Sequence, residues 1–191
     1  MIAGVILAAG CATRFGGPKV LAPLGGRAVV RHVADRLRAA GVAPLVVVVG
    51  DAEAGVVEAL AGTDAATVRN SRPEDGMSAS LRIGVDALPE DIGAFVVALG
   101  DQPFIDVDMV RHLARTWQES NAAAVVPVYR DGPGNPVLFD ATMRRLLRTL
   151  SGDAGARDLL HAMADHVVRV AVDADAPRDI DTPDDLRAIG G

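Results

Sequence analysis

Hydrophobic residues follow two patterns that alternate along the chain. Short continuous runs of apolar, often β-branched residues alternate with segments in which apolar residues recur every three or four positions. A continuous run predicts a strand buried on both faces, and the wider spacing predicts an amphipathic helix. The predicted strands span residues 1–8, 44–49, 66–68, 94–99, 122–128, 137–139 and 167–172. The predicted helices span about residues 30–40, 52–60, 76–88, 107–117, 143–150 and 156–164, with a last short helix capped by Thr182 and begun by Pro183.

This alternation predicts an α/β fold in which a mostly parallel sheet lies between two layers of helices, in the three-layer Rossmann-like arrangement. No linker, repeat or low-complexity segment interrupts the chain, so residues 1–191 are expected to form a single domain. Ligands in such sheets bind beyond the carboxyl ends of the strands. The loops that follow Ala8 and Leu99 are two such ends, and we expect the functional site there.

Composition narrows the classes of ligand. Aromatic residues make up only 3% of the chain, too few for the stacking surface that single-stranded nucleic acid needs. The net charge is −6 and no basic run occurs, which argues against binding to a nucleic-acid backbone. The one cysteine, Cys11, excludes an internal disulfide and a cysteine-type zinc site. With no apolar run long enough to span a membrane and no signal-peptide pattern, the protein is expected to be cytoplasmic.

The first strand leads directly into a glycine-rich loop. Its segment VILAAGCATRFGGPKVLAPL (5–24) holds Gly10, Gly16, Gly17 and the cations Arg14 and Lys19. Small residues let the backbone approach a ligand, successive N–H groups cradle an anion, and Arg and Lys neutralise it. The loop matches neither the Walker A motif nor the GxGxxG fingerprint. The alternative is a plain turn that carries two solvated cations. The order Gly10, Arg14, Gly16, Lys19 directly after a buried strand favours instead a loop that binds a nucleoside triphosphate.

Six motifs, in this order, resemble the signature of the MobA-like nucleotidyltransferases. They are LAAG-x3-RFG-x-PK-x-L-x-PLGG (7–26), GMSASL (76–81), LGDQP (99–103), GNPVLF (134–139), GDAGAR (152–157) and DIDTPDDL (179–186). Members of this family attach a nucleotide to the molybdenum cofactor, and relatives activate sugar and alditol phosphates. One departure is Ala12, where family members often carry a serine, so one side-chain contact to phosphate is absent. Backbone amides and Thr13 are the available substitutes.

The resemblance implies a magnesium-dependent site. The nucleotide contacts that it implies are Leu7, Ala8, Ala9, Gly10, Arg14, Lys19, Ser78 and Ser80, although a plain N-terminal helix cap explains either serine equally well. Asp101 is implied as a Mg²⁺ ligand, and Mg²⁺ favours few carboxylates completed by water and phosphate oxygens. Asp181 is implied as a second ligand, with Asp179 as its rival. Turn formation and helix capping are the alternative roles for these acids.

The implied reaction is nucleotidyl transfer. The acceptor phosphate attacks the α-phosphorus of the triphosphate in line and pyrophosphate leaves, which requires positioning and charge neutralisation rather than a protein nucleophile. Arg14, Lys19 and Asp101 are the implied catalytic residues. Asn135 and Arg157 are implied in binding the acceptor, although an asparagine in a turn and an arginine on a helix surface are ordinary.

Ala9 and the pair Pro18-Lys19 resemble the branch that transfers cytidylyl groups, whereas the guanylyl branch more often shows LAGG and a DK pair. We therefore expect CTP as the nucleotide and the molybdopterin cofactor as acceptor, with a molybdoenzyme or cofactor-transfer protein receiving the product. A sugar or alditol phosphate acceptor and a non-catalytic nucleotide- or cofactor-binding carrier stay open. Some relatives are called oxidoreductases, but the sequence has no dinucleotide fingerprint.

Overall fold

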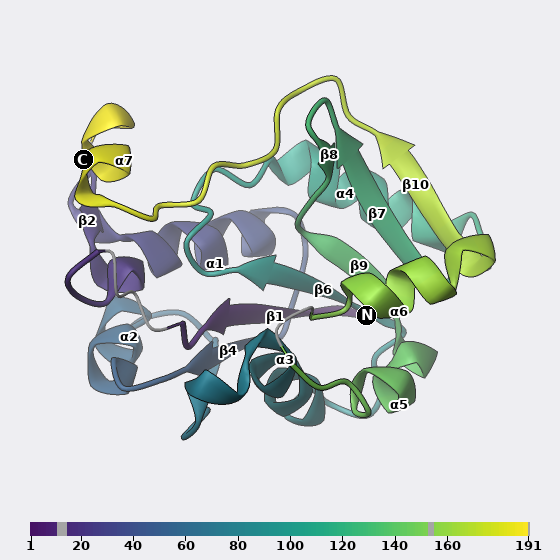
Figure 1. Cartoon of the computed structure of the whole chain (residues 1–191), viewed down its shortest axis with the longest axis horizontal. Coiled ribbons are helices and arrows are strands. Elements are labelled where there is room, and N and C mark those ends of the chain that lie inside the picture. The colour runs from purple at the N-terminus through teal and green to yellow at the C-terminus, as the bar shows by residue number, and fades with distance from the viewer. Residues whose placement is uncertain (11–14, 153–154, 191) are drawn as a thin grey trace.

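Most of the strands form one mixed sheet, and helices cover both of its faces (Figure 1). The structure, a computed structural model, describes residues 1–10, 15–152 and 155–190. The strands are β1 (Ile2–Ala8), β2 (Pro23–Leu24), β3 (Arg27–Ala28), β4 (Leu45–Val49), β5 (Ala66–Arg69), β6 (Ala94–Leu99), β7 (Ala124–Tyr129), β8 (Gly132–Pro133), β9 (Val137–Asp140) and β10 (Val167–Ala171). The helices are α1 (Val29–Ala39), α2 (Glu53–Ala59), α3 (Met77–Asp86), α4 (Val107–Gln118), α5 (Arg144–Leu147), α6 (Arg157–Ala162) and α7 (Pro183–Ala188). The predicted α/β fold with a mostly parallel sheet is confirmed.

The sheet has the strand order β10-β7-β9-β6-β1-β4-β5. Neighbours pair in parallel except β9, which runs antiparallel to both β6 and β7. The short β8 forms a hairpin with β7, and β2 and β3 form a separate two-stranded ribbon. Because β1, β4, β5 and β6 are parallel, their carboxyl ends meet at one edge of the sheet, where ligands bind in open α/β folds.

Three details differ from the sequence-based expectations. The strand at residues 137–140 runs antiparallel to both of its neighbours, β6 and β7. This direction depends on pairing with distant segments, so the local sequence pattern does not indicate it. The helix expected over 143–150 is shorter, with a 3-10 turn (Ala141–Met143) before the single turn of α5. The loop expected over 131–136 contains β8.

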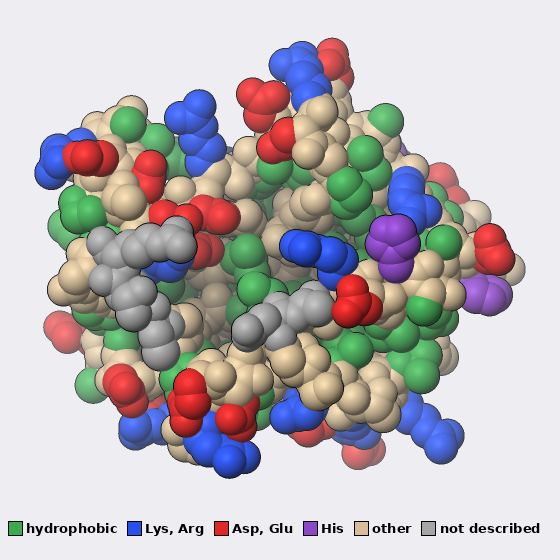
Figure 2. All heavy atoms as spheres, viewed as in Figure 1, with side chains coloured by type: hydrophobic (Ala, Val, Ile, Leu, Met, Phe, Trp, Pro, Cys, Tyr) green, Lys and Arg blue, Asp and Glu red, His purple; other side chains and the backbone are tan. Residues whose placement is uncertain are grey.

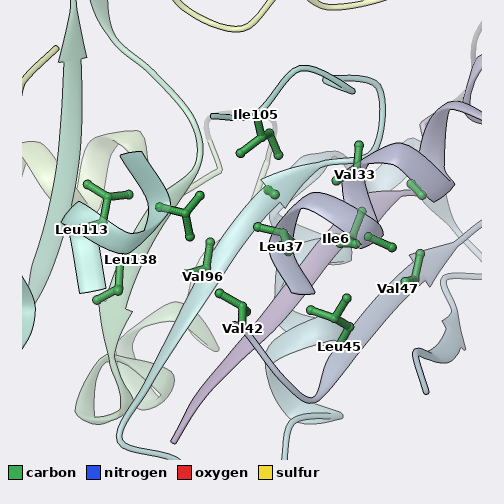
Figure 3. Close-up of a cluster of buried hydrophobic side chains, with 14 of the residues drawn as sticks. Ile6, Val33, Leu37, Val42, Leu45, Val47, Val96, Ile105, Leu113 and Leu138 are labelled. Carbon is green, nitrogen blue, oxygen red and sulfur yellow. The ribbon is translucent and has the colours of Figure 1, made fainter. Parts of the chain in front are cut away.

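The core consists of two apolar layers, one on each face of the sheet. Alternate strand residues enter alternate layers, because successive side chains of a strand point to opposite faces. One layer packs against α1, α2 and α4, and Figure 3 shows part of it, including Ile6, Val47 and Leu37. The other layer packs against α3, α5 and α6, and includes Val5, Val48 and the stacked pair Phe95–Phe139. Burial on both faces explains why the β4 sequence LVVVV shows no polar alternation.

Gly84 brings α3 unusually close to the sheet. A β-carbon at this position would overlap the Val5 side chain and lie 2.8 Å from Cγ2 of Val48. We expect Gly84→Ala to lower the free energy of unfolding by about 1 kcal/mol, because overpacking costs about 2 kcal/mol and alanine regains about 1 kcal/mol of helix propensity. Urea denaturation measures the change. An unchanged or higher stability would contradict this close contact.

The C-terminal segment returns across the molecule to the carboxyl edge of the sheet (Figure 1). Ile180 is fully buried against Ala22, Leu24 and Val29, and its N–H donates to the backbone carbonyl of Asp101 at 3.1 Å. The expected cap is present, because Thr182 and Asp185 form a reciprocal capping box at the start of α7. These contacts bring the acids that flank Ile180 to the end of β6. None of the helices in the described residues is long and apolar enough to cross a membrane.

Candidate active site

A cavity of about 340 Å³ opens at the carboxyl ends of β1 and β6. The residues expected to contact nucleotide or metal that line it are Leu7, Ala8, Ala9, Gly10, Lys19, Ser80 and Asp101. An adjoining cavity of about 440 Å³ shares residues 8–10 and Lys19 as lining and extends past Pro18 to Gly50. Both volumes fall in the range of small-molecule sites. The structure therefore brings strand-end residues, the end of the glycine loop and the start of α3 to one place.

Lys19 holds two carboxylates together beside this cavity. Its Nζ lies 2.5 Å from Oδ2 of Asp101 and 2.7 Å from Oδ1 of Asp181. The Lys19 and Asp101 side chains are 17% and 15% exposed, whereas Asp181 is 49% exposed. Partial burial lowers the pKa of Lys19, but the hydrogen bonds and charges of the two carboxylates outweigh it and raise the pKa overall. Lys19 thus carries a fixed positive charge at the mouth of the site.

Asp179 lies near this trio but has a different partner. Its Oδ1 accepts a hydrogen bond of 2.7 Å from Nε2 of Gln102, a buried residue of the LGDQP motif. Partial burial raises the pKa of Asp179, and the charges of Asp101 and Asp181 add to this, against the hydrogen bond from Gln102. The two acids on either side of Ile180 therefore play different parts: Asp181 contacts Lys19, and Asp179 contacts Gln102.

Ser80 projects into the cavity from the first turns of α3. Its Oγ accepts a hydrogen bond of 2.9 Å from Nδ2 of Asn70, which is itself buried. The orientation of the Asn70 amide is fixed, because its Oδ1 accepts the backbone N–H of Arg72 at 2.9 Å. With one of its two lone pairs engaged in this way, the Ser80 hydroxyl still has its own hydrogen to donate.

Ser78 does not line the cavity, so the structure adds no support to its expected contact with nucleotide. Its side chain is fully buried, and its backbone N–H donates to the carbonyl of Gly152 at 3.1 Å. Residues two apart on a helix point about 200° away from each other, so only one of the two serines faces the cavity. Ser80 is the serine that lines the cavity.

The two residues expected to bind the acceptor lie elsewhere. Asn135 is half-buried and its backbone carbonyl accepts the Tyr129 hydroxyl at 2.8 Å, while Arg157 is exposed at the start of α6. Neither lines the cavity beside Asp101. Arg14, with Cys11, Ala12 and Thr13, lies outside the described residues, so its expected role is not placed.

Two buried polar residues at the site were not among the sequence-based candidates. Asn70 directly follows β5, and its N–H donates to the carbonyl of Val49 at 2.8 Å, so it lies at the carboxyl edge of the sheet. Gln102 follows Asp101 in the loop after β6. Both residues follow strands, as Asp101 does. The rule that ligands bind beyond the carboxyl ends of parallel strands therefore points to both of them as well.

The donor set suits a divalent metal that takes most of its ligands from substrate. Among the described residues no three His, Cys, Asp or Glu side chains are close enough together to hold a metal ion. Two carboxylates do converge on a cation, however, since both Asp101 and Asp181 reach Lys19. Mg²⁺ typically takes one or two carboxylates and completes its shell with phosphate oxygens and water. The residues present fit that pattern, because Asp101 and Asp181 offer two neighbouring carboxylates.

The fold and this site are those of a nucleotidyltransferase. A nucleotide-sized cavity lies at the carboxyl edge of the parallel strands, and Asp101 and Asp181 lie beside Lys19. More particularly, the chain belongs to the MobA-like NTP transferase family, whose domain model matches residues 4–168.

Three relatives illustrate the range of this similarity. The nicotine blue oxidoreductase of Paenarthrobacter nicotinovorans is 35% identical over 167 residues, which cover 83% of this chain and 81% of that protein. The crystal structure of Rv0371c from Mycobacterium tuberculosis superposes with a TM-score of 0.86 at 35% identity, over 99% of this chain and 96% of the other, and Rv0371c is also known as a manganese complex. A nucleotidyl transferase from Methanothermobacter gives a TM-score of 0.81 at 28% identity, over 100% and 96%.

Proposed function

We propose that this nucleotidyltransferase transfers CMP from CTP to the phosphate of the molybdopterin cofactor and releases pyrophosphate. The observation that carries the proposal is the placement of Lys19 between Asp101 and Asp181 at the mouth of a nucleotide-sized cavity. The preference for CTP rests on Ala9 and Pro18, which match the cytidylyl-transferring branch of the family. The acceptor also rests on that resemblance. Residues 1–191 are proposed to act as one domain, with a molybdoenzyme or cofactor-transfer protein as the partner that receives the product.

In this reaction an oxygen of the acceptor phosphate forms a bond to the α-phosphorus, and the bond from that phosphorus to the bridging oxygen of pyrophosphate breaks. Residues 8–10 border the space proposed for the phosphates, and Lys19 is proposed to offset charge that develops on them. Arg14 is proposed to share this task. Mg²⁺ held by Asp101 and Asp181 supplies further charge neutralisation when bound.

Ser80 is proposed to select the base by donating a hydrogen bond. Asn70 donates to the Ser80 oxygen, so the Ser80 hydroxyl hydrogen is directed away from Asn70. The Ser80 hydroxyl is therefore proposed to donate to a group that accepts a hydrogen bond in the cavity. The O2 and N3 atoms of cytosine are such acceptors, which agrees with the proposed nucleotide.

The isosteric change Asn70→Asp tests this polarity. An aspartate still accepts the Arg72 N–H through one oxygen, but its other oxygen accepts the Ser80 hydroxyl, which then no longer donates to the base. We expect KM for CTP to rise about tenfold, the effect of about 1.4 kcal/mol for one lost hydrogen bond in the cavity. Ser80→Ala should produce a loss of similar size, and combining the two changes should add little. Strictly additive losses would contradict the coupling of Asn70 to the base through Ser80.

A titration with CTP and GTP in the presence of Mg²⁺ tests the choice of nucleotide. We expect tighter binding of CTP, and clearly tighter binding of GTP would overturn the assignment. A pyrophosphate-release screen of nucleotides against phosphorylated acceptors then tests the reaction itself. Release with a sugar or alditol phosphate, but not with molybdopterin, would change the acceptor. Nucleotide binding without release for any acceptor would support a carrier.

The relative named nicotine blue oxidoreductase raises a second candidate, an oxidoreductase activity. Incubation of the protein with reduced nicotinamide cofactors and redox dyes tests it. In the proposed reaction Lys19 offsets charge on the phosphates and the carboxylates of Asp101 and Asp181 would hold the metal, and none of the three has an evident part in hydride transfer. We therefore expect no cofactor oxidation above the rate without protein.

A further inference from the structure

A second pocket, of about 360 Å³, lies between α6 and the edge strand β10, apart from the nucleotide cavity. The charged and titratable side chains that line it are Arg157, His161 and Arg169. The other described lining residues, from β7, β8, α6 and β10, are apolar: Val126, Pro133, Leu160 and Val167. No carboxylate is among the described residues that line it, although the chain as a whole has a net charge of −6.

The topology explains why these three side chains meet. Arg169 on β10 is paired in register with Val126 on β7, so both lie at one level of the sheet. Val168 and Val170 of β10 pack into the layer on the α4 side of the sheet, so Arg169, like Val167, points to the face that α6 covers. Arg157 and His161 are four residues apart on α6 and therefore share one side of that helix.

An arginine on this face needs a reason, because the neighbouring position, Val167, packs into the apolar layer beneath α6. All three polar side chains are exposed, and within the described residues neither Arg157 nor Arg169 lies within 4 Å of a carboxylate. Figure 2 shows basic side chains and a histidine over α6 and β10 on one side of the central hollow, with an acidic side chain beside them, and a group of acidic side chains on the opposite side. The molecule thus offers basic side chains on the side of the hollow opposite the group of acidic side chains.

We propose that this pocket binds an anionic group of the acceptor substrate, a step that rests on the proposed function. Two guanidinium groups suit a phosphate-like anion, which they hold through paired hydrogen bonds. The apolar floor suits the organic part attached to it. Because the pocket and the nucleotide cavity share no lining residue, the group held here is not the phosphate that attacks. The acceptor is therefore a molecule with two separated anionic groups, one that reacts near Asp101 and one that anchors at Arg157 and Arg169.

Titration with inorganic phosphate tests the site without any turnover. The ring signals of His161, observed by NMR, are expected to move and to saturate as phosphate is added. Arg157→Gln and Arg169→Gln should each weaken this binding about tenfold, the effect of losing one charged hydrogen bond. Arg145→Gln is the matched control, because Arg145 is an exposed arginine on α5 outside the pocket. It should leave the binding unchanged.

The contrary reading is that Arg169 only protects the edge strand β10 from pairing with other chains. It predicts no saturable shift of His161, or an equal weakening in Arg145→Gln, and either result would overturn the site. A second arm uses the pyrophosphate-release assay. With an acceptor that supports turnover, Arg157→Gln and Arg169→Gln should raise KM for the acceptor about tenfold and leave KM for CTP unchanged.

If phosphate binds at His161 but neither variant changes KM for the acceptor, the pocket is an anion site that the acceptor does not use, and its assignment to the acceptor is wrong. If no acceptor supports turnover, the proposed function fails, while the phosphate titration still decides whether the pocket binds an anion. The two failures are thus distinguishable.

Discussion

Replacing Asp101 by asparagine is expected to lower kcat/KM for pyrophosphate release by about a thousandfold, the upper range for losing one preorganised electrostatic contact in an active site. Asparagine keeps the size of the side chain but removes the negative charge that faces Lys19 at 2.5 Å. It also leaves the backbone carbonyl that accepts the Ile180 N–H, so the C-terminal segment keeps its attachment. The loss should therefore fall on catalysis rather than on folding.

Two measurements separate these effects. Thermal unfolding of Asp101→Asn should stay close to that of the unaltered protein, because Lys19 retains Asp181 as a partner. Asp173→Asn is the matched control: it makes the same chemical change at an exposed acid that pairs with Arg130 and lies away from the cavity. Its turnover should be normal. A loss below tenfold in Asp101→Asn, with Mg²⁺ saturating, would rule out Asp101 as a metal ligand in the reaction.

The elements that local sequence dictates were predictable. β4 is an unbroken run of apolar residues because both of its faces are covered, and the cap at Thr182 depends only on residues within one helical turn. The position of the cavity was predictable from one general rule, that parallel strands present their carboxyl ends at the same edge. That rule identified the loops after β1 and β6, which hold Ala9, Gly10 and Asp101.

The remainder depended on contacts between distant segments. The antiparallel direction of β9 follows from its pairing with β6 and β7, which no local pattern encodes. The sequence does not distinguish Asp179 from Asp181 as a candidate metal ligand, because their positions depend on the hydrogen bond from the Ile180 N–H to the segment after β6. With that bond in place, Asp179 contacts Gln102 and Asp181 contacts Lys19. Likewise, the rotation of α3 against the sheet decides that Ser80 rather than Ser78 faces the cavity.

The second large effect is expected at Lys19. In Lys19→Met the side chain keeps the length of the lysine stem but loses the ammonium group that contacts both Asp101 and Asp181. We expect kcat/KM for pyrophosphate release to fall about a hundredfold or more, because the phosphates lose a preorganised positive charge. Lys19→Arg keeps the charge but presents a planar fork in place of a compact ammonium group, so its activity should lie between the two.

A direct measurement of metal binding shows whether Lys19 and the metal share the same carboxylates. Without nucleotide, the ammonium of Lys19 already occupies the space between Asp101 and Asp181 and competes with a divalent cation for them. Its removal leaves two like charges close together, which strengthens their attraction for a cation. Lys19→Met should therefore bind Mn²⁺ more tightly than the unaltered protein in the absence of CTP, as measured by the electron paramagnetic resonance of free Mn²⁺. Lys19→Arg should bind it about as weakly as the unaltered protein. If Mn²⁺ affinity is unchanged in Lys19→Met while turnover is lost, Lys19 acts on the nucleotide alone, and the metal is held by other ligands.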